Sequence, residues 1–325
     1  MTILVTGAAG FIGFHVAKAL LERGDAVLGI DNLNDYYDVR LKQARLAQLQ
    51  VFRAFSFAQL NIADRSRVLA LVDSRKDLAS IIHLAAQAGV RYSLENPYAY
   101  LDANVTSTLV MLEAARRIEN LSAITYASSS SVYGANKQQP FSVEDRVDQP
   151  VSLYAATKRS CELIAHTYSH LYGLPATGLR FFTVYGPWGR PDMAAYLFTR
   201  AILSGEPIKV FNEGRMARDF TYIDDIVAGT VAAHDRLPAP VDGVPHRIYN
   251  LGNHRPVQLL DFIAVLEREL GYKAKKELLP LQPGDVPESF ADIAASHRDL
   301  GFDPKTTIEV GLARFVEWYR QYHQA

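Results

Sequence analysis

The chain has 325 residues, 49% hydrophobic and 21% charged, which is ordinary globular composition with room for one large core and a smaller lobe. Its 34 basic and 35 acidic residues give a net charge of -1, and no basic run is interleaved with aromatic residues, so nucleic acid is not expected as a partner. No apolar stretch nears about 18 residues and Cys161 is the single cysteine, so we expect a cytoplasmic protein without a membrane partner or a disulfide framework.

Short apolar runs alternate with amphipathic stretches along the first half of the chain. The runs predicted to form strands are residues 3–6, 26–31, 80–85, 123–128 and 177–181. Helices are expected between them, the first over residues 14–23. Alternation of strand and helix predicts an α/β fold with a parallel, doubly wound sheet and helices on both faces.

A glycine turn follows the first predicted strand, with Gly7, Gly10 and Gly13 spaced Gly-x-x-Gly-x-x-Gly. Such glycines permit a tight turn, let the backbone approach a pyrophosphate and allow a helix to pack closely on a strand. Asp31 ends the second strand, near the roughly 20-residue offset at which a carboxylate binds the adenosine ribose hydroxyls. This carboxylate would repel a 2'-phosphate, and the following Asn32 supplies no positive charge, so NAD is favoured over NADP.

The predicted strand at 123–128 runs into four serines, Ser128 to Ser131, which we call the serine run. Because it follows an apolar strand, it should lie at the carboxyl edge of the sheet, where open α/β folds bind ligands. Tyr154 and Lys158 follow, at the i, i+4 spacing that puts two side chains on one helix face. The lysine ammonium can lower the pKa of the tyrosine phenol, which predicts a general base.

Beyond residue 180 the alternation becomes irregular, with a Gly-Pro-rich loop at 186–191 and a second break at 238–240. The segment 218–222 with the helix from Asp224 that follows it, and the strand at 247–251, can rejoin the sheet. The expected division is an NAD-binding Rossmann domain of residues 1–180, which residues 215–255 rejoin, and a smaller C-terminal substrate-binding lobe of residues 181–214 and 256–325.

Several segments together give a family resemblance. They are the glycine turn, Asp31, the HLAAQ segment at 83–87, the serine run, Tyr154 with Lys158, RFFTVYGP at 180–187 and RDF at 218–220. Over nearly its whole length the chain resembles the extended short-chain dehydrogenases/reductases of the nucleotide-sugar epimerase group. Within that group, residues 31–37, 86–93 and 189–193 are most similar to UDP-glucuronate 4-epimerases.

The resemblance implies an isomerase that oxidises carbon 4 of a UDP-sugar to a transient 4-keto intermediate and reduces it on the other face, with tightly bound NAD and with UDP-glucuronate as the favoured substrate. Ser129 then binds the 4-oxygen, Tyr154 is the base and Lys158 holds the nicotinamide ribose. The implied NAD contacts are Gly7, Gly10, Phe11, Ile12, Gly13, Asp31, Asn32, Asn61, Ile62, Leu84, Ala85, Ala86, Gln87, Tyr154 and Lys158. The implied substrate contacts are Arg91, Ser129, Ser130, Ser131, Thr183, Arg190, Phe211 and Arg218.

Three alternatives stay open: a UDP-glucose 4-epimerase, a UDP-glucuronate decarboxylase and a nucleotide-binding regulatory protein on the same fold. Related sugar dehydratases and decarboxylases carry Thr-Asp-Glu or Thr-Ser-Glu where this chain has Ser129-Ser130-Ser131. Without that acid no group is evident for elimination beyond the 4-keto stage, which favours epimerisation. The intact Tyr154 and Lys158 argue against a protein without turnover.

A few further residues complete the expectations. Arg190 is predicted to bind the sugar carboxylate together with Thr183 and the serine run. Asn61 stands where the family commonly has an aspartate that contacts adenine, and its amide can still form a hydrogen bond. His166 and His170 lack a third ligand, so no metal is expected. The resemblance also implies a homodimer through two helices per subunit, the helix that carries Tyr154 and the helix after residues 92–100.

Overall fold

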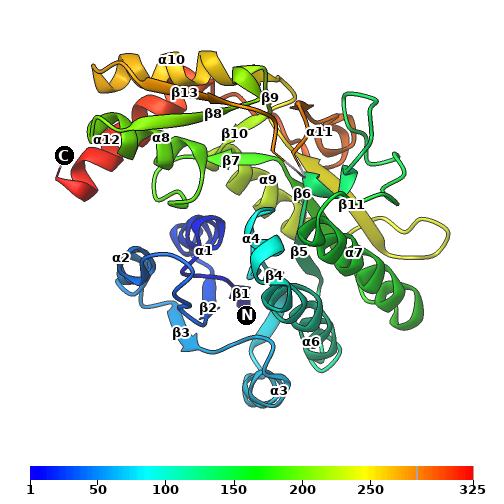
Figure 1. Ribbon diagram of the computed structural model, residues 1–325. Coiled ribbons are helices and arrows are strands. Elements are labelled where there is room, and N and C mark those ends of the chain that lie inside the picture. Colours follow the sequence, from blue (N-terminus) through cyan, green and yellow to red (C-terminus); the bar gives the residue numbers. More distant parts are fainter. Residues whose placement is uncertain (283–284, 325) are drawn as a thin grey trace.

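The computed structural model describes residues 1–282 and 285–324. At its centre lies a seven-stranded parallel sheet in the order β11-β6-β5-β4-β1-β2-β3 (Figure 1). The strands are β1 (Thr2–Thr6), β2 (Ala26–Asp31), β3 (Phe55–Gln59), β4 (Leu78–His83), β5 (Ile124–Ser129), β6 (Ala176–Phe181) and β11 (His246–Leu251). The predicted α/β fold with a doubly wound parallel sheet is confirmed. β11 comes from the second half of the chain and pairs with β6 at the sheet edge.

Two expected elements differ from the structure by two residues or more, and one strand of the central sheet was not expected. The strand expected at 80–85 is β4 at Leu78–His83, and the first helix begins at Phe11 because Gly10, in extended conformation, is its N-cap. The edge strand β3 was not predicted. None of its residues is buried, so its sequence lacks the apolar run by which the buried strands were identified.

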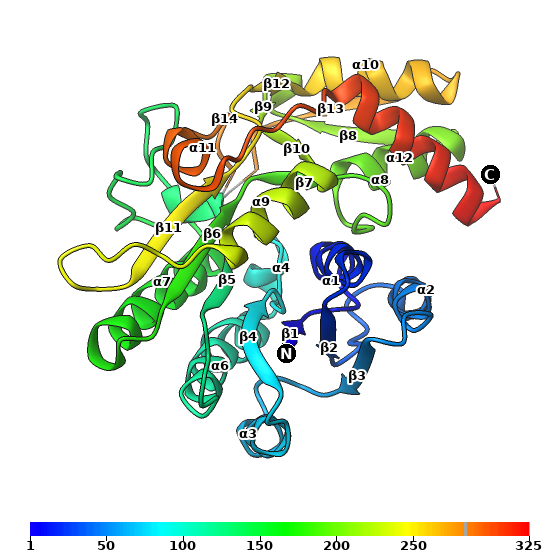
Figure 2. The same ribbon diagram turned by 180° about the vertical axis from the view of Figure 1, so that it is seen from behind.

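Helices cover both faces of the sheet (Figures 1 and 2). On one face α1 (Phe11–Arg23) packs against α9 (Ile223–Asp235), with α2 (Val39–Leu49) beside α1. On the other face lie α3 (Arg65–Ser74), α6 (Ser107–Ala115) and α7 (Leu153–Tyr172). Short helices α4 (Tyr92–Glu95) and α5 (Pro97–Tyr100) and a π-helical stretch, η1 (Leu101–Thr106), lead into α6. A 3-10 turn, η2 (Ser130–Tyr133), follows β5.

The remaining elements gather at the carboxyl edge of the sheet. Three small sheets pair β7 (Thr183–Tyr185) with β10 (Phe220–Tyr222), β8 (Pro207–Phe211) with β13 (Lys275–Leu279), and β9 (Ala217–Arg218) with β12 (Val257–Gln258) and β14 (Glu288–Ser289). The helices are α8 (Ala194–Leu203), α10 (Leu259–Leu270), α11 (Ala294–Leu300) and α12 (Ile308–His323), with a 3-10 turn, η3 (Asn212–Gly214). Aromatic side chains fill this core, where Phe220 stacks on Phe262 with ring centroids 4.1 Å apart. None of the described helices combines the length and apolarity needed to span a bilayer.

Candidate active site

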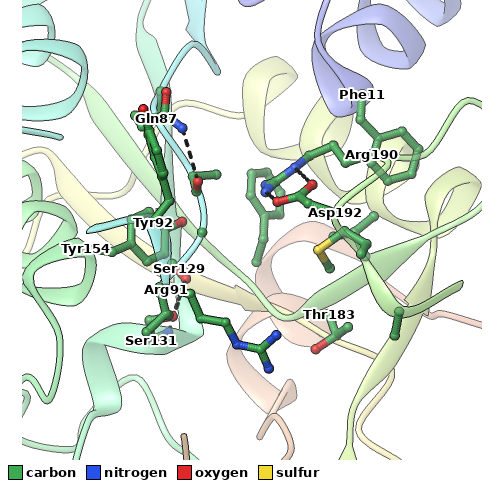
Figure 3. A pocket seen from close by; sticks show the side chains of 18 of the residues that line it. Phe11, Gln87, Arg91, Tyr92, Ser129, Ser131, Tyr154, Thr183, Arg190 and Asp192 are labelled. Carbon is green, nitrogen blue, oxygen red and sulfur yellow. Dashed lines mark hydrogen bonds and ion pairs between the residues drawn. The ribbon is translucent and has the colours of Figure 1, made fainter. Parts of the chain in front are cut away.

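A large pocket of about 1040 Å³ lies where the carboxyl ends of the central strands meet the C-terminal elements. Every residue predicted to contact cofactor or substrate lines it, from the glycine turn through the serine run to Thr183, Phe211 and Arg218. Figure 3 shows Ser129 and Tyr154 across the cavity from Arg190. The fold therefore brings residues that are far apart in sequence into one cavity.

The glycine turn lines this pocket at the start of α1. Gly7 has a φ of +72°, and a Cβ there would lie 2.8 Å from the backbone nitrogen of Ala85. A Cβ on Gly13 would lie 2.0 Å from the carbonyl oxygen of Gly7. Only glycine fits either position, so the backbone stays open to a large ligand at the start of α1. This cradle fits the pyrophosphate of a dinucleotide.

Asp31 lies at the end of β2 and is held in place by backbone donors. Its carboxylate accepts hydrogen bonds from the N–H groups of Ala9, at 3.1 Å, and Leu33, at 2.8 Å. Next to it the buried Lys42 donates through Nζ to the carbonyl oxygen of Asn34 at 2.7 Å. Burial lowers the pKa of Lys42, and the negative charge of the nearby Asp31 carboxylate partly offsets this lowering. The carboxylate is thus fixed at the place expected for a ribose contact.

The segment after β4 packs against the glycine turn and is tied to α7, the helix that carries Tyr154. Asn104, from the π-helical stretch η1, accepts the N–H of Gln87 at 2.8 Å and donates to the Gln87 carbonyl at 3.1 Å. The same amide donates to the Thr157 hydroxyl on α7 at 3.0 Å. Behind this segment, His83 contacts the Thr6 hydroxyl at 2.8 Å, and burial lowers the pKa of His83 to about 3. The ring is therefore neutral at pH 7.

One wall of the pocket carries the residues predicted to act on carbon 4, and we call it the catalytic wall: Ser129, Tyr154 and Lys158. Ser129 ends β5, while Tyr154 and Lys158 lie in the first turns of α7. Lys158 donates through Nζ to the Ala127 carbonyl at 2.9 Å, which fixes α7 against β5. The Tyr154 ring packs edge-on against Tyr100 with centroids 6.0 Å apart. The predicted base is therefore held by packing as well as by its helix.

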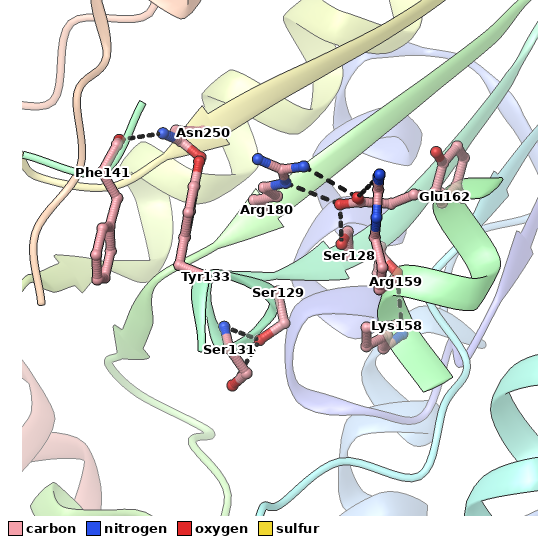
Figure 4. A network of polar contacts seen from close by, with 12 residues as sticks. Ser128, Ser129, Ser131, Tyr133, Phe141, Lys158, Arg159, Glu162, Arg180 and Asn250 are labelled. Atoms are coloured by element: carbon pink, nitrogen blue, oxygen red, sulfur yellow. Dashed lines mark hydrogen bonds and ion pairs between the residues drawn. The ribbon is translucent and has the colours of Figure 1, made fainter. Parts of the chain in front are cut away.

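A buried polar network stands behind the catalytic wall (Figure 4). Arg180 on β6 binds Glu162 on α7 through Nε at 2.8 Å and Nη2 at 3.0 Å. Glu162 also accepts the Ser128 hydroxyl at 2.6 Å and the Arg159 guanidinium at 3.0 Å. Burial is the largest single influence and acts to raise the pKa of Glu162, but the hydrogen bonds and charge of Arg180, together with the bonds from Ser128 and Arg159, outweigh it and lower the pKa. The network joins α7 to the residue just before Ser129, so it fixes two parts of the catalytic wall relative to each other.

The opposite wall contains a second arginine and carboxylate, and we call it the Arg190 wall: Arg190, Asp192 and Tyr36. Arg190 binds Asp192 through Nε at 3.0 Å and Nη2 at 2.5 Å, as Figure 3 shows. The Tyr36 hydroxyl donates to the same carboxylate at 3.1 Å. Burial alone would lower the pKa of Arg190, but the charge of Asp192 raises it. The guanidinium is thus preorganised at the pocket, already facing a carboxylate.

Two more of the predicted substrate residues that line the pocket, Arg91 and Arg218, gather around an acid. Arg91 lies over the ring of Phe211, with its guanidinium carbon 4.9 Å from the centroid. Asp285 lies 3.7 Å from Arg91 and 4.0 Å from Arg218. Burial lowers the pKa of Arg218. Two guanidinium groups and an aromatic face are suited to a phosphorylated, ring-containing ligand.

Several polar residues that line the pocket had no role assigned from the sequence, among them Tyr36, Lys42, Asp192 and Asp285. Asp192 carried a usable signal, because a carboxylate two positions after an arginine in one loop can pair with it. Tyr36 belongs to the segment 31–37 that carries the family resemblance, whereas Lys42 and Asp285 had no signal, since their positions near the site depend on the tertiary fold.

The histidines and the cysteine considered from the sequence lie outside this pocket. His166 and His170 are exposed on α7, whereas Cys161 is buried. Across residues 1–282 and 285–324, no three or more His, Cys, Asp or Glu side chains are arranged to hold a metal ion.

Comparisons with known proteins agree with this geometry. The NAD dependent epimerase/dehydratase family matches residues 3–252. A probable UDP-glucuronate 4-epimerase of Rhizobium meliloti is 48% identical over 100% of this chain and 98% of its own length. UDP-glucuronate 4-epimerase 4 of Arabidopsis thaliana is 50% identical over 99% of this chain and 76% of its own length.

Solved structures extend the likeness to three dimensions. The crystal structure of UDP-glucuronic acid 4-epimerase from Bacillus cereus, in complex with UDP-glucuronic acid and NAD, matches with a TM-score of 0.90 at 35% identity, covering 99% of this chain and 100% of that one. The predicted resemblance to extended short-chain dehydrogenases/reductases of the epimerase group is thereby confirmed. The chain belongs to the NAD dependent epimerase/dehydratase family.

Proposed function

We propose that this protein is an NAD-dependent 4-epimerase that converts UDP-glucuronate to UDP-galacturonate. The observation that carries the proposal is the pocket itself. It places Ser129, Tyr154 and Lys158 beside a glycine cradle and opposite a preorganised guanidinium, Arg190. The similarity to UDP-glucuronate 4-epimerases over the whole chain supports the same substrate.

The residues of the catalytic wall are suited to proton transfer at the 4-hydroxyl. The glycine cradle would hold NAD, which would supply the hydride acceptor and donor for the hydrogen on carbon 4. Ser129 holds the 4-oxygen, and Tyr154 removes its proton during oxidation and returns it during reduction. Lys158 orients the nicotinamide ribose. Between the two transfers the 4-keto sugar turns over, so that the opposite face meets the cofactor.

The two arginines around Asp285 are suited to the diphosphate of the nucleotide. Arg91 and Arg218 converge on Asp285, and a diphosphate can take the place of that carboxylate. Phe211 offers a flat apolar face beside them. Binding of the diphosphate here would leave the sugar in the same pocket as Ser129 and Tyr154.

Arg190, with Thr183 and the serine run, is suited to bind the sugar carboxylate. Oxidation at carbon 4 makes a β-keto acid, which loses carbon dioxide when the bond from carbon 5 to the carboxylate aligns with the carbonyl π system. The electron pair of that bond then forms an enolate, which takes up a proton. A guanidinium that holds the carboxylate out of this alignment protects the intermediate.

We further propose a homodimer through the helices η1–α6 and α7. Exposed apolar side chains on these helices support it: Leu101, Leu109, Leu163 and Leu171. Sedimentation analysis of the wild type and of Leu163→Glu tests this interface, and a wild-type monomer would rule it out.

The cytoplasmic location stays a prediction. The assignment of residues 1–180 with 215–255 to an NAD domain, and of residues 181–214 and 256–325 to a substrate lobe, also stays a prediction.

Product analysis tests the activity directly. The purified protein is incubated separately with UDP-glucuronate, UDP-glucose and UDP-N-acetylglucosamine, and the dinucleotide released on denaturation is identified. We expect UDP-galacturonate as the main product and NAD as the released cofactor. Conversion of only the neutral sugars, or a decarboxylated pentose as the main product, would replace the proposal with one of the two rival enzymes. Absence of turnover with every sugar would favour a binding protein.

A further inference from the structure

Arg45, on α2, is fully buried although it carries a positive charge. Its Nη1 donates to the Ala9 carbonyl at 3.0 Å and to the Tyr37 hydroxyl at 2.7 Å. Its Nη2 donates to the carbonyls of Trp188, at 2.6 Å, and Gly189, at 3.2 Å, and Nε donates to Trp188 at 3.1 Å. All five N–H donors of the guanidinium are therefore bound to oxygen.

These acceptors belong to two segments with separate roles in the site. Ala9 lies inside the glycine turn, which is the proposed binding site of the pyrophosphate. Trp188 and Gly189 immediately precede Arg190 in the chain. One guanidinium therefore bridges the cofactor cradle and the loop of the Arg190 wall, and its planar fork fixes their relative position more tightly than a flexible ammonium could.

The same loop is anchored to the cofactor side by two further contacts. The His15 ring, from α1, contacts the Pro187 carbonyl through Nε2 at 3.0 Å, and the Phe14 ring lies edge-on to Trp188 with centroids 5.9 Å apart. Trp188 has a left-handed backbone with a φ of 60°, which a bulky residue keeps only when its surroundings hold it there. Three consecutive carbonyls, of residues 187–189, thus face donors from the cofactor half.

Charge gives a second reason to connect Arg45 with the cofactor. Within the part of the chain that the structure describes, no carboxylate is paired with this guanidinium, although buried charges are ordinarily paired. The uncompensated positive charge lies directly behind the turn where a dianionic pyrophosphate would bind. Attraction between the two favours an occupied turn.

We propose that Arg45 is a positioning residue that couples dinucleotide binding at the glycine turn to the placement of Arg190. The inference rests on the proposed function, because it gives Arg190 the task of restraining the sugar carboxylate. When the turn is occupied, Arg45 holds the carbonyls of Trp188 and Gly189 and so fixes the next residue. Misplacement of a restraining group by about 1 Å can cost about 10²-fold in a reaction.

Hydrogen exchange tests the coupling without any turnover. Exchange of peptides spanning residues 186–193 is measured in protein stripped of dinucleotide and in protein reloaded with NAD. We expect NAD to slow exchange in the wild type and in Arg40→Met, a control on the same helix whose side chain is 84% exposed. The slowing should shrink in Arg45→Lys and vanish in Arg45→Met. Equal slowing in the wild type and Arg45→Lys, or none in the wild type, would overturn the inference.

A milder variant covers the case in which Arg45→Met fails to fold. Tyr37→Phe removes one of the acceptors of Arg45 and leaves the charge and the four other hydrogen bonds in place. The NAD-dependent slowing at residues 186–193 should then decrease by a smaller amount in the same direction. A Tyr37→Phe protein with the full wild-type slowing would count against Arg45 as the coupling group.

Product partition tests the consequence for the reaction. With UDP-glucuronate, Arg45→Lys should raise the ratio of decarboxylated 4-keto pentose to UDP-galacturonate, and Arg190→Ala should raise it more. The double variant should equal Arg190→Ala alone, because Arg45 acts through that residue. A merely structural role would lower kcat without changing the ratio, and that result, or independent effects in the double variant, would overturn the inference. If the wild type makes no UDP-galacturonate, the proposed function fails while the exchange experiment still decides the role of Arg45.

Discussion

The two walls of the pocket each contain an arginine paired with a carboxylate, but the two pairs have different surroundings. Behind the catalytic wall, the side chains of Arg180 and Glu162 are 3% and 1% exposed. On the Arg190 wall, the side chains of Arg190 and Asp192 are 21% and 32% exposed. The first pair is sealed among protein groups, and the second is open to whatever enters the pocket.

This difference separates two uses of one interaction. A sealed pair cannot exchange partners without leaving a buried charge uncompensated, so it holds the geometry around Ser128 and α7. An open pair can exchange Asp192 for the carboxylate of a ligand, because both acids accept the same two N–H groups. The fixed geometry of the sealed pair suits the chemistry at carbon 4 of the sugar. The exchangeable partner of the open pair suits recognition of the sugar carboxylate, whose carbon is carbon 6. Variants on each wall should therefore fail in different ways.

Tyr154→Phe should give the largest effect and should confine it to turnover. The change removes one hydroxyl, and loss of a general base typically slows a reaction by about 10²- to 10⁴-fold. Bound NAD and the fold should persist, since the ring keeps its packing against Tyr100. Steady-state rates and dinucleotide content measure both. Tyr172→Phe, at the exposed end of the same helix, is the matched control, and near wild-type activity in Tyr154→Phe would remove it as the base.

Glu162→Gln should act mainly on stability. It leaves the Arg180 guanidinium buried without its counterion, and breaking a buried pair in this way costs about 3–5 kcal/mol. Denaturant unfolding measures the loss. Glu213→Gln breaks an exposed pair with Arg215 and should change stability by no more than about 0.5 kcal/mol. Equal losses in the two variants would erase the distinction between sealed and open pairs.

Arg190→Ala should act mainly on selectivity. A hydrogen bond between arginine and a carboxylate contributes about 1.5–3 kcal/mol, which corresponds to roughly one to two decades in kcat/KM for UDP-glucuronate. The share of decarboxylated 4-keto pentose should rise, while the free energy of unfolding changes less than in Glu162→Gln. Product ratios and kcat/KM for UDP-glucuronate against UDP-glucose measure this. Unchanged selectivity and product ratio would make Arg190 a bystander and weaken the uronate assignment.

Acid should destabilise the protein by a smaller amount, through His83. Its pKa is lowered from 6.5 to about 3, first by burial and then by the charge of Lys158, so the folded state keeps the ring neutral while the unfolded state takes up a proton below about pH 6.5. Stability is full above that pH and is lost as the pH falls toward 3. Between pH 7 and 5.5 we expect a loss of about 1 kcal/mol from this residue. Urea unfolding at both pH values should show a smaller change in His83→Asn, and an equal change would exclude His83 as the source.

The sequence predicted what depends on local spacing and on the strand pattern. The glycine turn, Asp31 at the end of β2, and Tyr154 with Lys158 are set by short-range geometry. The partners of the arginines are different, because Asp285 reaches Arg91 and Arg218 only through the folding of the C-terminal elements. Arg45 shows the same limit. It occupies an ordinary helical position, and its acceptors at Trp188 and Gly189 lie more than 140 residues away in the chain.

The two acids that face the pocket arginines, Asp192 and Asp285, also affect how the protein responds to salt. With no anionic ligand present, each already supplies the negative charge that a sugar carboxylate or a diphosphate would bring. The positive electrostatic potential of Arg91, Arg190 and Arg218 is therefore partly neutralised before the ligand binds. Binding then exchanges a protein carboxylate for an anionic group of the ligand. Association of the nucleotide sugar should accordingly depend only weakly on ionic strength, despite the three arginines that line its path.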